Sequence, residues 1–124
     1  MPIETSYELN EKYLHFYCTG KFKFENMQDA FSKSFDVAIQ NDQVVILVDG
    51  MGLEGTPPTF IERFRLGEYV AQLCLDHGKP FRIAVSGNEP IIDPDRFGEK
   101  VARNRGVNGK VFTDLEEAKE WLVR

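Results

Sequence analysis

Apolar and polar residues alternate in two stretches near the start of the chain, residues 3–9 and residues 13–18. Alternation with a period of two is typical of strands that bury one face, and the polar residues 10–12 between the stretches suit a turn. We therefore expect an antiparallel hairpin with one apolar face. The apolar neighbours of His15 would point inward, so we interpret His15 as a surface residue.

Farther along the chain, apolar residues recur at the spacing of one helical face. The pattern predicts four helices, which run from Asn26 to about Asn41, from Thr59 to about His77, from Asp93 onward, and from a capping box at Thr113 onward. Gly78 and Pro80 are a clear stop for the second of these helices.

The start of the second helix has two candidate caps. Thr59 and Glu62 have the spacing of a capping box, and Thr56 followed by Pro57 offers a competing start. Phe60 belongs to the apolar stripe of this helix, so we expect it to be buried.

Three further segments, residues 44–48, 81–86 and 110–112, are predicted strands. The first is continuously apolar, which is typical of a strand covered on both faces; we expect it to end at Asp49, with a flexible loop through Gly55. A hairpin followed by alternating helices and strands predicts an α/β fold. We expect a single domain over residues 1–124, with a mixed sheet, right-handed crossovers and about four helices.

The composition is typical of a single globular domain, and it argues against some classes of partner and location. The 124 residues are 42% apolar and 28% charged, which is close to the balance of globular proteins. The net charge of −5 argues against a nucleic-acid partner. No apolar run reaches the roughly 18 residues of a membrane span, and the start of the chain lacks a signal-peptide pattern, so we expect a cytoplasmic protein.

The two cysteines, Cys18 and Cys74, do not have the spacing of a disulfide framework or of a zinc site. We expect both to be buried, unreactive thiols.

Residues 50–55 spell the dinucleotide-binding pattern G-x-G-x-x-G between a strand and a helix. In that motif the third glycine packs within the start of the helix. Here Pro57 and Pro58 hold the helix start beyond Gly55, and the charge of Asp49 would repel a pyrophosphate. We therefore expect a loop and no cofactor, and the positions of the two histidines do not suggest a metal site.

Polar side chains follow two predicted strands at their carboxyl ends, where open α/β sheets bind ligands. The candidate binding residues are Asp49, Glu54, Thr56, Thr59, Ser86 and Asn88. We interpret Asp49 as an acceptor that caps its own loop; the alternative is a pair with Glu54 for acid–base chemistry. Phe22 and Phe24 lie in a loop-like stretch and could cover a pocket or form a partner surface.

Four parts of the chain, residues 44–49, 55–68, 81–86 and 97–122, resemble a known group of proteins. The most specific part is the last, FGEKVARNRGVNGKVFTDLEEAKEWL. It resembles the bacterial STAS-like proteins related to anti-sigma-factor antagonists, whose fold is compared with that of the CRAL-TRIO lipid-transfer domains. The resemblance implies a STAS-like fold over most of the chain.

The resemblance also implies a function. In anti-sigma-factor antagonists, a kinase phosphorylates a serine or threonine at a helix start, which switches partner binding. Here Asp49 matches the acidic residue that ends the strand, and Thr59 or Thr56 would be the phosphorylated residue, with Thr-Pro-Pro-Thr in place of the usual Asp-Ser-Ser step. We expect a non-catalytic regulatory module that binds a protein partner through residues 49–59.

Two other functions stay open. The ten phenylalanines and the CRAL-TRIO comparison suggest a carrier or sensor of a small apolar ligand, such as a lipid, held between the helices and the sheet. The third hypothesis is an enzyme of hydrolase type that uses Asp49 and Glu54. A homodimer is compatible with so small a domain.

Overall fold

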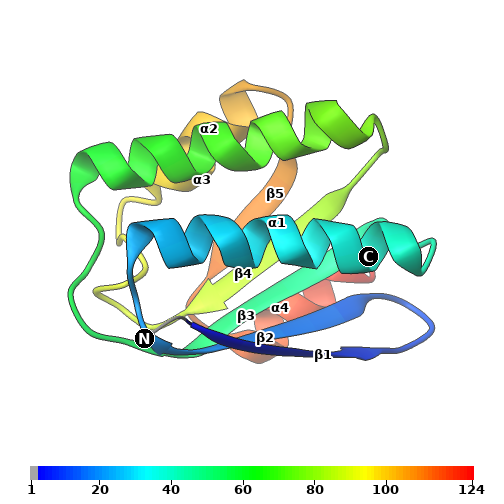
Figure 1. Cartoon of the computed structure of the whole chain (residues 1–124), viewed down its shortest axis with the longest axis horizontal. Coiled ribbons are helices and arrows are strands. Elements are labelled where there is room, and N and C mark those ends of the chain that lie inside the picture. Colours follow the sequence, from blue (N-terminus) through cyan, green and yellow to red (C-terminus); the bar gives the residue numbers. More distant parts are fainter. Residues whose placement is uncertain (1–2) are drawn as a thin grey trace.

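Five strands form one sheet in the computed structural model, which describes residues 3–124 (Figure 1). The strands are β1 (Glu4–Leu9), β2 (Leu14–Lys21), β3 (Val45–Glu54), β4 (Arg82–Gly87) and β5 (Asn108–Phe112). They lie side by side in chain order. β1 pairs with β2 antiparallel, and the pairs from β2 to β5 are parallel. The predicted hairpin and mixed sheet are confirmed.

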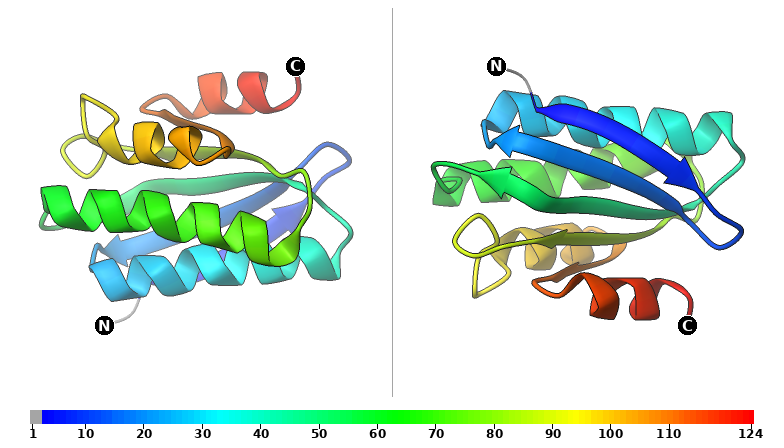
Figure 2. Two further views of the ribbon diagram at one scale, coloured as in Figure 1. Left: turned by 90° about the horizontal axis from the view of Figure 1, so that it is seen from above. Right: turned by 90° about the horizontal axis from the view of Figure 1, so that it is seen from below.

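Four helices cover this sheet unequally, and the predicted α/β fold class is confirmed. They are α1 (Phe24–Gln40), α2 (Phe60–His77), α3 (Phe97–Asn104) and α4 (Leu115–Leu122). Helices α1, α2 and α3 lie over one face, here called the front face, and α4 lies over the other, the back face (Figure 2). None of the helices formed by residues 3–124 is both long and apolar enough to cross a bilayer.

Alternate residues of β3 enter two separate hydrophobic cores. Ile46 and Val48 point to the front face, where they pack with side chains of α1, α2 and α3. Leu47 points to the back face and packs with Ala118 and Leu122 of α4. Both faces of the strand are therefore covered, which explains the continuous apolar run in the sequence.

β3 continues well beyond its predicted end. The loop expected over residues 50–55 is wrong, because the strand runs on to Glu54. A register shift between Tyr17 and Thr19 allows the end of β2 to keep pairing with this extension. There is little room for a side chain at position 52, because a Cβ atom on Gly52 would lie 2.7 Å from the Thr19 side chain.

The capping box at the start of α2 is confirmed. The Thr59 hydroxyl oxygen accepts the Glu62 N–H at 3.1 Å, and the Glu62 carboxylate accepts the Thr59 N–H at 2.9 Å. The competing start at Thr56 is not used, because α2 begins only at Phe60. At the other end, Gly78 takes the left-handed conformation (φ 63°) and ends the helix as predicted.

The other helix starts differ from the prediction by a few residues. α1 begins at Phe24 instead of Asn26, α3 at Phe97 instead of near Asp93, and α4 after a cap at Asp114 instead of Thr113. Asp93 still contributes to α3, since its carboxylate accepts the Phe97 N–H at 3.0 Å. Asp114 accepts the Glu117 N–H at 3.1 Å.

Helix α2 packs against α1 and α3, and its buried side chains join the front-face core that these helices form with the strands. Its contact with α3 is very close: a Cβ atom on Gly67 would lie 2.7 Å from the Gly98 carbonyl oxygen and 2.9 Å from Val101 Cβ. α2 therefore bridges its two neighbours above the front face, and space remains beneath it.

The two cysteines are free thiols. Cys18 is buried as expected, and Cys74 is half-buried. Burial raises the pKa of Cys18 to about 12 and that of Cys74 to about 11, so both thiols are protonated at neutral pH.

Candidate functional site

The back face carries a buried polar cluster formed by His15, Asp49 and Ser86 of three adjacent strands. His15 Nε2 lies 2.7 Å from Asp49 Oδ2, and each of these two residues is only 6% exposed. The interpretation of His15 as a surface residue is therefore wrong. The Tyr17 ring stacks on the imidazole with 4.0 Å between ring centroids, which helps to cover it from solvent.

Asp49 is the centre of this cluster. Its Oδ1 accepts the Met51 N–H at 3.0 Å and lies 3.5 Å from Ser86 Oγ. The bond to Met51, two residues along, is a local acceptor bond, but it lies within β3 and not in the loop that Asp49 was expected to cap. Burial raises the pKa of the Asp49 carboxyl, but the hydrogen bonds from His15, Met51 and Ser86 outweigh it and hold the pKa below its usual value. Asp49 is therefore charged at neutral pH.

The order of these groups is not that of a Ser-His-Asp triad. In such a triad the imidazole lies between serine and carboxylate and takes the serine proton. Here the carboxylate of Asp49 lies between His15 and Ser86, and Ser86 is fully buried. Across residues 3–124, the His, Cys, Asp and Glu side chains form no group of three or more that could hold a metal ion. The cluster thus joins three strands and presents no attacking atom.

The structure does not bring Glu54 to Asp49. Both belong to β3, five residues apart, which is about 16 Å at the rise of a strand. Asn88, which follows β4, donates to the Met51 carbonyl at 3.0 Å and ties the loop to β3. The proposed carboxylate pair is absent, while Asn88 does lie beside the end of β3.

The two candidate threonines lie on the other side of the sheet. Thr56 and Thr59 are exposed and lead into α2, which lies over the front face (Figure 2). Asp49 and Ser86 alternate with the front-face residues Val48 and Val85 of their strands and point to the back face. The sheet therefore separates the two threonines from Asp49 and Ser86.

The first turn of α2 presents apolar side chains to solvent. Phe60 is 67% exposed and Ile61 is 60% exposed. The Phe60 ring stacks on Phe97 of α3, with 4.3 Å between ring centroids. We call these three residues the apolar patch. The predicted burial of Phe60 is wrong, because this side chain rests on α3 and not under its own helix.

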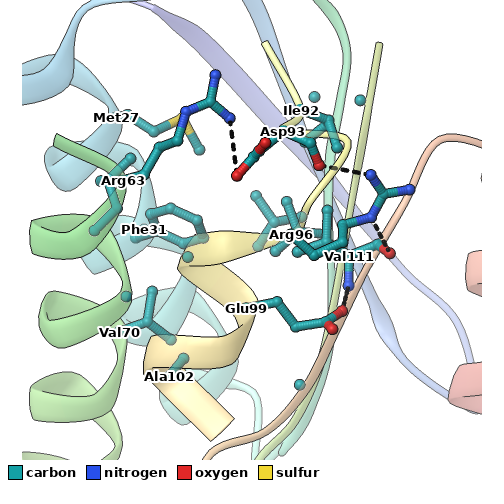
Figure 3. A pocket seen from close by; sticks show the side chains of 18 of the residues that line it. Met27, Phe31, Arg63, Val70, Ile92, Asp93, Arg96, Glu99, Ala102 and Val111 are labelled. Carbon is teal, nitrogen blue, oxygen red and sulfur yellow. Dashed lines mark hydrogen bonds and ion pairs between the residues drawn. The ribbon is translucent and has the colours of Figure 1, made fainter. Parts of the chain in front are cut away.

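A cavity of about 150 Å³ lies beneath α2, between the front-face helices and the sheet (Figure 3). Apolar side chains from α1, α2, α3, β3 and β4 line most of it, among them Met27, Phe31, Val48, Val70, Ile83 and Ala102. Phe22 is buried and lines it as well. The cavity lies where α2 bridges α1 and α3 above the strands.

Charged side chains lie where the loop after β4 meets the cavity, and Arg63 and Asp93 face each other there (Figure 3). Arg63 donates to two backbone carbonyls at 3.2 and 3.1 Å, and its guanidinium is 4.0 Å from the Asp93 carboxylate. Partial burial raises the pKa of Asp93, but backbone N–H donors and the charges of Arg63 and Arg96 outweigh it, so the pKa is lowered.

Arg96 and Glu99, two further charged residues of the lining, are also bound to protein. Arg96 donates to the Asp93 carbonyl at 2.7 Å and to the Val111 carbonyl at 3.3 Å. Glu99 accepts the Val111 N–H at 2.7 Å. These bonds attach α3 and its preceding loop to β5.

Sequence reasoning placed Asp49 and Ser86 at neighbouring strand ends and suggested an apolar ligand between the helices and the sheet. It missed His15 as the partner of Asp49 and most of the residues that line the cavity, for the same reason. The residues of the polar cluster and of the cavity come from several elements far apart in the chain; His15 and Asp49, for example, are separated by 34 positions. The one usable signal was the isolated acidic residue at the end of an apolar strand, which did mark Asp49 as special.

Comparison with known proteins adds the fold family. No family model matches the sequence, and no curated protein matches it. The structure is similar to that of an anti-sigma factor antagonist from Mycobacterium paratuberculosis, with a TM-score of 0.63 and 12% identity over 97% of this chain and 93% of that chain. It is also similar to an uncharacterized protein of the DUF3478 family with a SpoIIAA-like fold from Shewanella loihica PV-4, with a TM-score of 0.55 and 24% identity over 98% of this chain and 94% of that chain.

At these identities the likeness establishes the fold. The STAS-like fold that residues 97–122 and the other matching segments implied is therefore confirmed.

Proposed function

We propose that this protein is a non-catalytic regulatory module that binds a protein partner through the start of α2. One solved structure with the same fold is an anti-sigma factor antagonist, and the sequence resemblance implies partner binding at this helix start. The observation that carries the proposal is the exposure of Phe60 and Ile61 directly after a capped helix start.

The geometry of this turn suits binding. A large apolar side chain that moves from water into an interface contributes about 1.5–3 kcal/mol. The reciprocal bonds between Thr59 and Glu62 already order the turn, so little conformational entropy is lost when a partner binds. Phe60 and Ile61 then act as anchors, with the charged residues around them as a polar rim.

Phosphorylation of Thr59 or Thr56 would change this surface in two different ways. A phosphate at Thr59 would lie at the helix N-terminus, which favours negative charge, but it would repel the Glu62 carboxylate that accepts the Thr59 N–H. The capping box would then rearrange beneath Phe60. A phosphate at Thr56 would leave both capping bonds in place and add charge beside the patch.

The remaining candidate residues have different parts in this proposal. Asp49 and Ser86 are 6% and 0% exposed, so they support the ends of the strands and do not touch a partner. Glu54 and Asn88 are exposed near the carboxyl ends of the strands and would lie at the edge of an interface.

The test is affinity capture from extracts of the source cells with three forms of the protein: wild type, the double variant Phe60→Ser/Ile61→Ser, and Leu75→Ser. Leu75 is 72% exposed near the other end of α2, so it is a matched control for the loss of an exposed apolar side chain. Quantitative mass spectrometry should find a partner that the double variant loses at least tenfold and Leu75→Ser retains. Identical partner sets for all three forms would contradict the proposal.

Phosphomimetic variants test which of the two threonines controls partner binding. Thr59→Glu should change the captured partner set more than Thr56→Glu, because only the first disturbs the capping box.

Light scattering on the purified protein tests whether the partner is a second copy of this chain, since a dimer that uses the patch would dissociate in the double variant.

The comparisons do not favour the alternative of a ligand carrier as the main function. The cavity beneath α2 nevertheless supports a ligand site within a partner-binding module.

A further inference from the structure

We propose that the cavity beneath α2 binds a compact, uncharged apolar molecule about the size of one aromatic ring, and that its occupation strengthens partner binding at the apolar patch. The ligand site depends only on the cavity. The effect of the ligand on partner binding rests on the proposed function.

The size of the cavity selects the ligand. Native interiors contain few voids larger than a water molecule, so a space of about 150 Å³ is unusual in a core of this size. An apolar cavity of about this volume, lined by aliphatic and aromatic side chains, stays dry and binds benzene or xenon. Met27, Phe31, Val70 and Ala102 form such a lining here (Figure 3).

The polar groups around the cavity exclude a charged ligand. Arg63, Arg96, Asp93 and Glu99 already bind protein atoms. Lys110 is the remaining charged residue of the lining, and its ammonium lies over the ring of Phe112, a residue of the back-face core. Among the described residues, the buried side-chain atom that lacks a hydrogen-bond partner is Arg82 Nε. The Arg82 guanidinium lies over the Trp121 ring on the back face, away from the cavity. A ligand would therefore gain from apolar contact alone.

α2 connects the cavity to the patch. Arg63, Leu66 and Val70 line the cavity from above, and Phe60 and Ile61 occupy the turn that begins the same helix. Because residues of α2 line the cavity, a molecule in the cavity would add contacts to the underside of this helix. A bound ligand would then favour one position of the first turn, and partner and ligand would strengthen each other by the same factor.

Ligand binding is tested first, without any partner. Toluene is the probe, benzoate is its charged counterpart, and binding is followed by protein NMR titration and by the shift of Tm. Toluene should bind saturably and raise Tm, and benzoate should not. Absence of saturable toluene binding up to its solubility limit, or equal binding of benzoate, would overturn the ligand site.

Cavity variants show where the probe binds. Ala102→Leu places three more carbons in the cavity and should weaken toluene binding at least tenfold, while Val70→Ala enlarges the cavity and should favour naphthalene over toluene. Val70→Leu replaces Ala102→Leu if that variant does not fold. Unchanged toluene affinity in a folded filling variant would place the probe elsewhere and contradict the proposal.

The coupling between the cavity and the apolar patch is measured separately, by hydrogen exchange and by partner recovery. Saturating toluene should slow hydrogen exchange in the first turn of α2 by several-fold and leave the amides around Leu75 unchanged, and partner recovery in the capture experiment should rise with toluene. If toluene binds but no captured partner depends on the apolar patch, the ligand site is supported and the proposed function is contradicted. If the recovery of the partner does not change with toluene, only the proposed coupling between ligand and partner binding is contradicted.

Discussion

The two faces of the sheet are packed in opposite ways, although the same strands supply both. On the back face, Asp49 accepts bonds from His15, Met51 and Ser86, and the cluster is closed to solvent. On the front face, three helices cover the strands, yet a cavity of about 150 Å³ remains under α2. The smaller helical cover thus lies over the face that carries the buried polar cluster.

The difference indicates where this molecule can respond to another. A buried carboxylate with all its partners in place has one good arrangement, and removing a partner leaves a charge unpaired in the interior. An apolar cavity lacks such a constraint, because its lining can gain contacts without breaking any bond. We therefore place function on the front face and structural support on the back face.

The largest predicted effect is the loss of Asp49. In Asp49→Ala the buried His15 and Ser86 lose their acceptor, and breaking a buried pair in this way costs about 3–5 kcal/mol. Urea unfolding should show this decrease in the free energy of unfolding, while the exposed Asp95→Ala should change it by less than about 0.5 kcal/mol. A loss below about 1 kcal/mol for Asp49→Ala would mean that the cluster does not support the back face as described.

The next effect concerns the close contact between α2 and α3. A methyl group on Gly67 would meet the Gly98 carbonyl and Val101, so we expect Gly67→Ala to cost about 1–3 kcal/mol. Gly98→Ala is the matched control, because its Cβ would lie 3.2 Å from the Arg63 carbonyl oxygen, a milder approach. Equal unfolding free energies for the two variants would show that α2 is free to move away from α3.

Removal of the helix cap should have a smaller effect. Thr59→Ala removes the acceptor for the Glu62 N–H and should destabilise the protein by about 1 kcal/mol. Thr56→Ala, at the competing start that the helix does not use, should change stability by less than about 0.5 kcal/mol. Chemical denaturation of both variants measures the difference, and an equal loss in the two would contradict the role of the capping box.

The smallest predicted effect is a pH dependence that originates in Asp49. Its pKa is lowered in the folded protein, so its contribution to stability is fully present above the unfolded pKa of about 3.9 and is lost as the pH falls through the lower folded pKa. The difference in unfolding free energy between wild type and Asp49→Asn should therefore shrink below about pH 5. Denaturation curves at several pH values measure it, and a constant difference down to pH 3 would be inconsistent with the lowered pKa.

The sequence by itself determined the elements whose causes are local. The alternation in residues 13–18, the apolar run in residues 44–48, and the stop at Gly78 each depend on neighbours within a few positions. The Thr59–Glu62 capping box is a bond across three residues, so its spacing was visible directly. The order of these elements was enough to predict the mixed sheet.

Tertiary structure decided what depends on distant parts of the chain. His15 is buried because Asp49, 34 positions later, gives it a partner. Phe60 packs on Phe97 of another helix and not into the core, so most of its side chain stays exposed. The cavity exists because α2 spans α1 and α3. Local patterns report how each residue suits its own helix or strand, whereas burial, pairing and empty space depend on how separate elements meet.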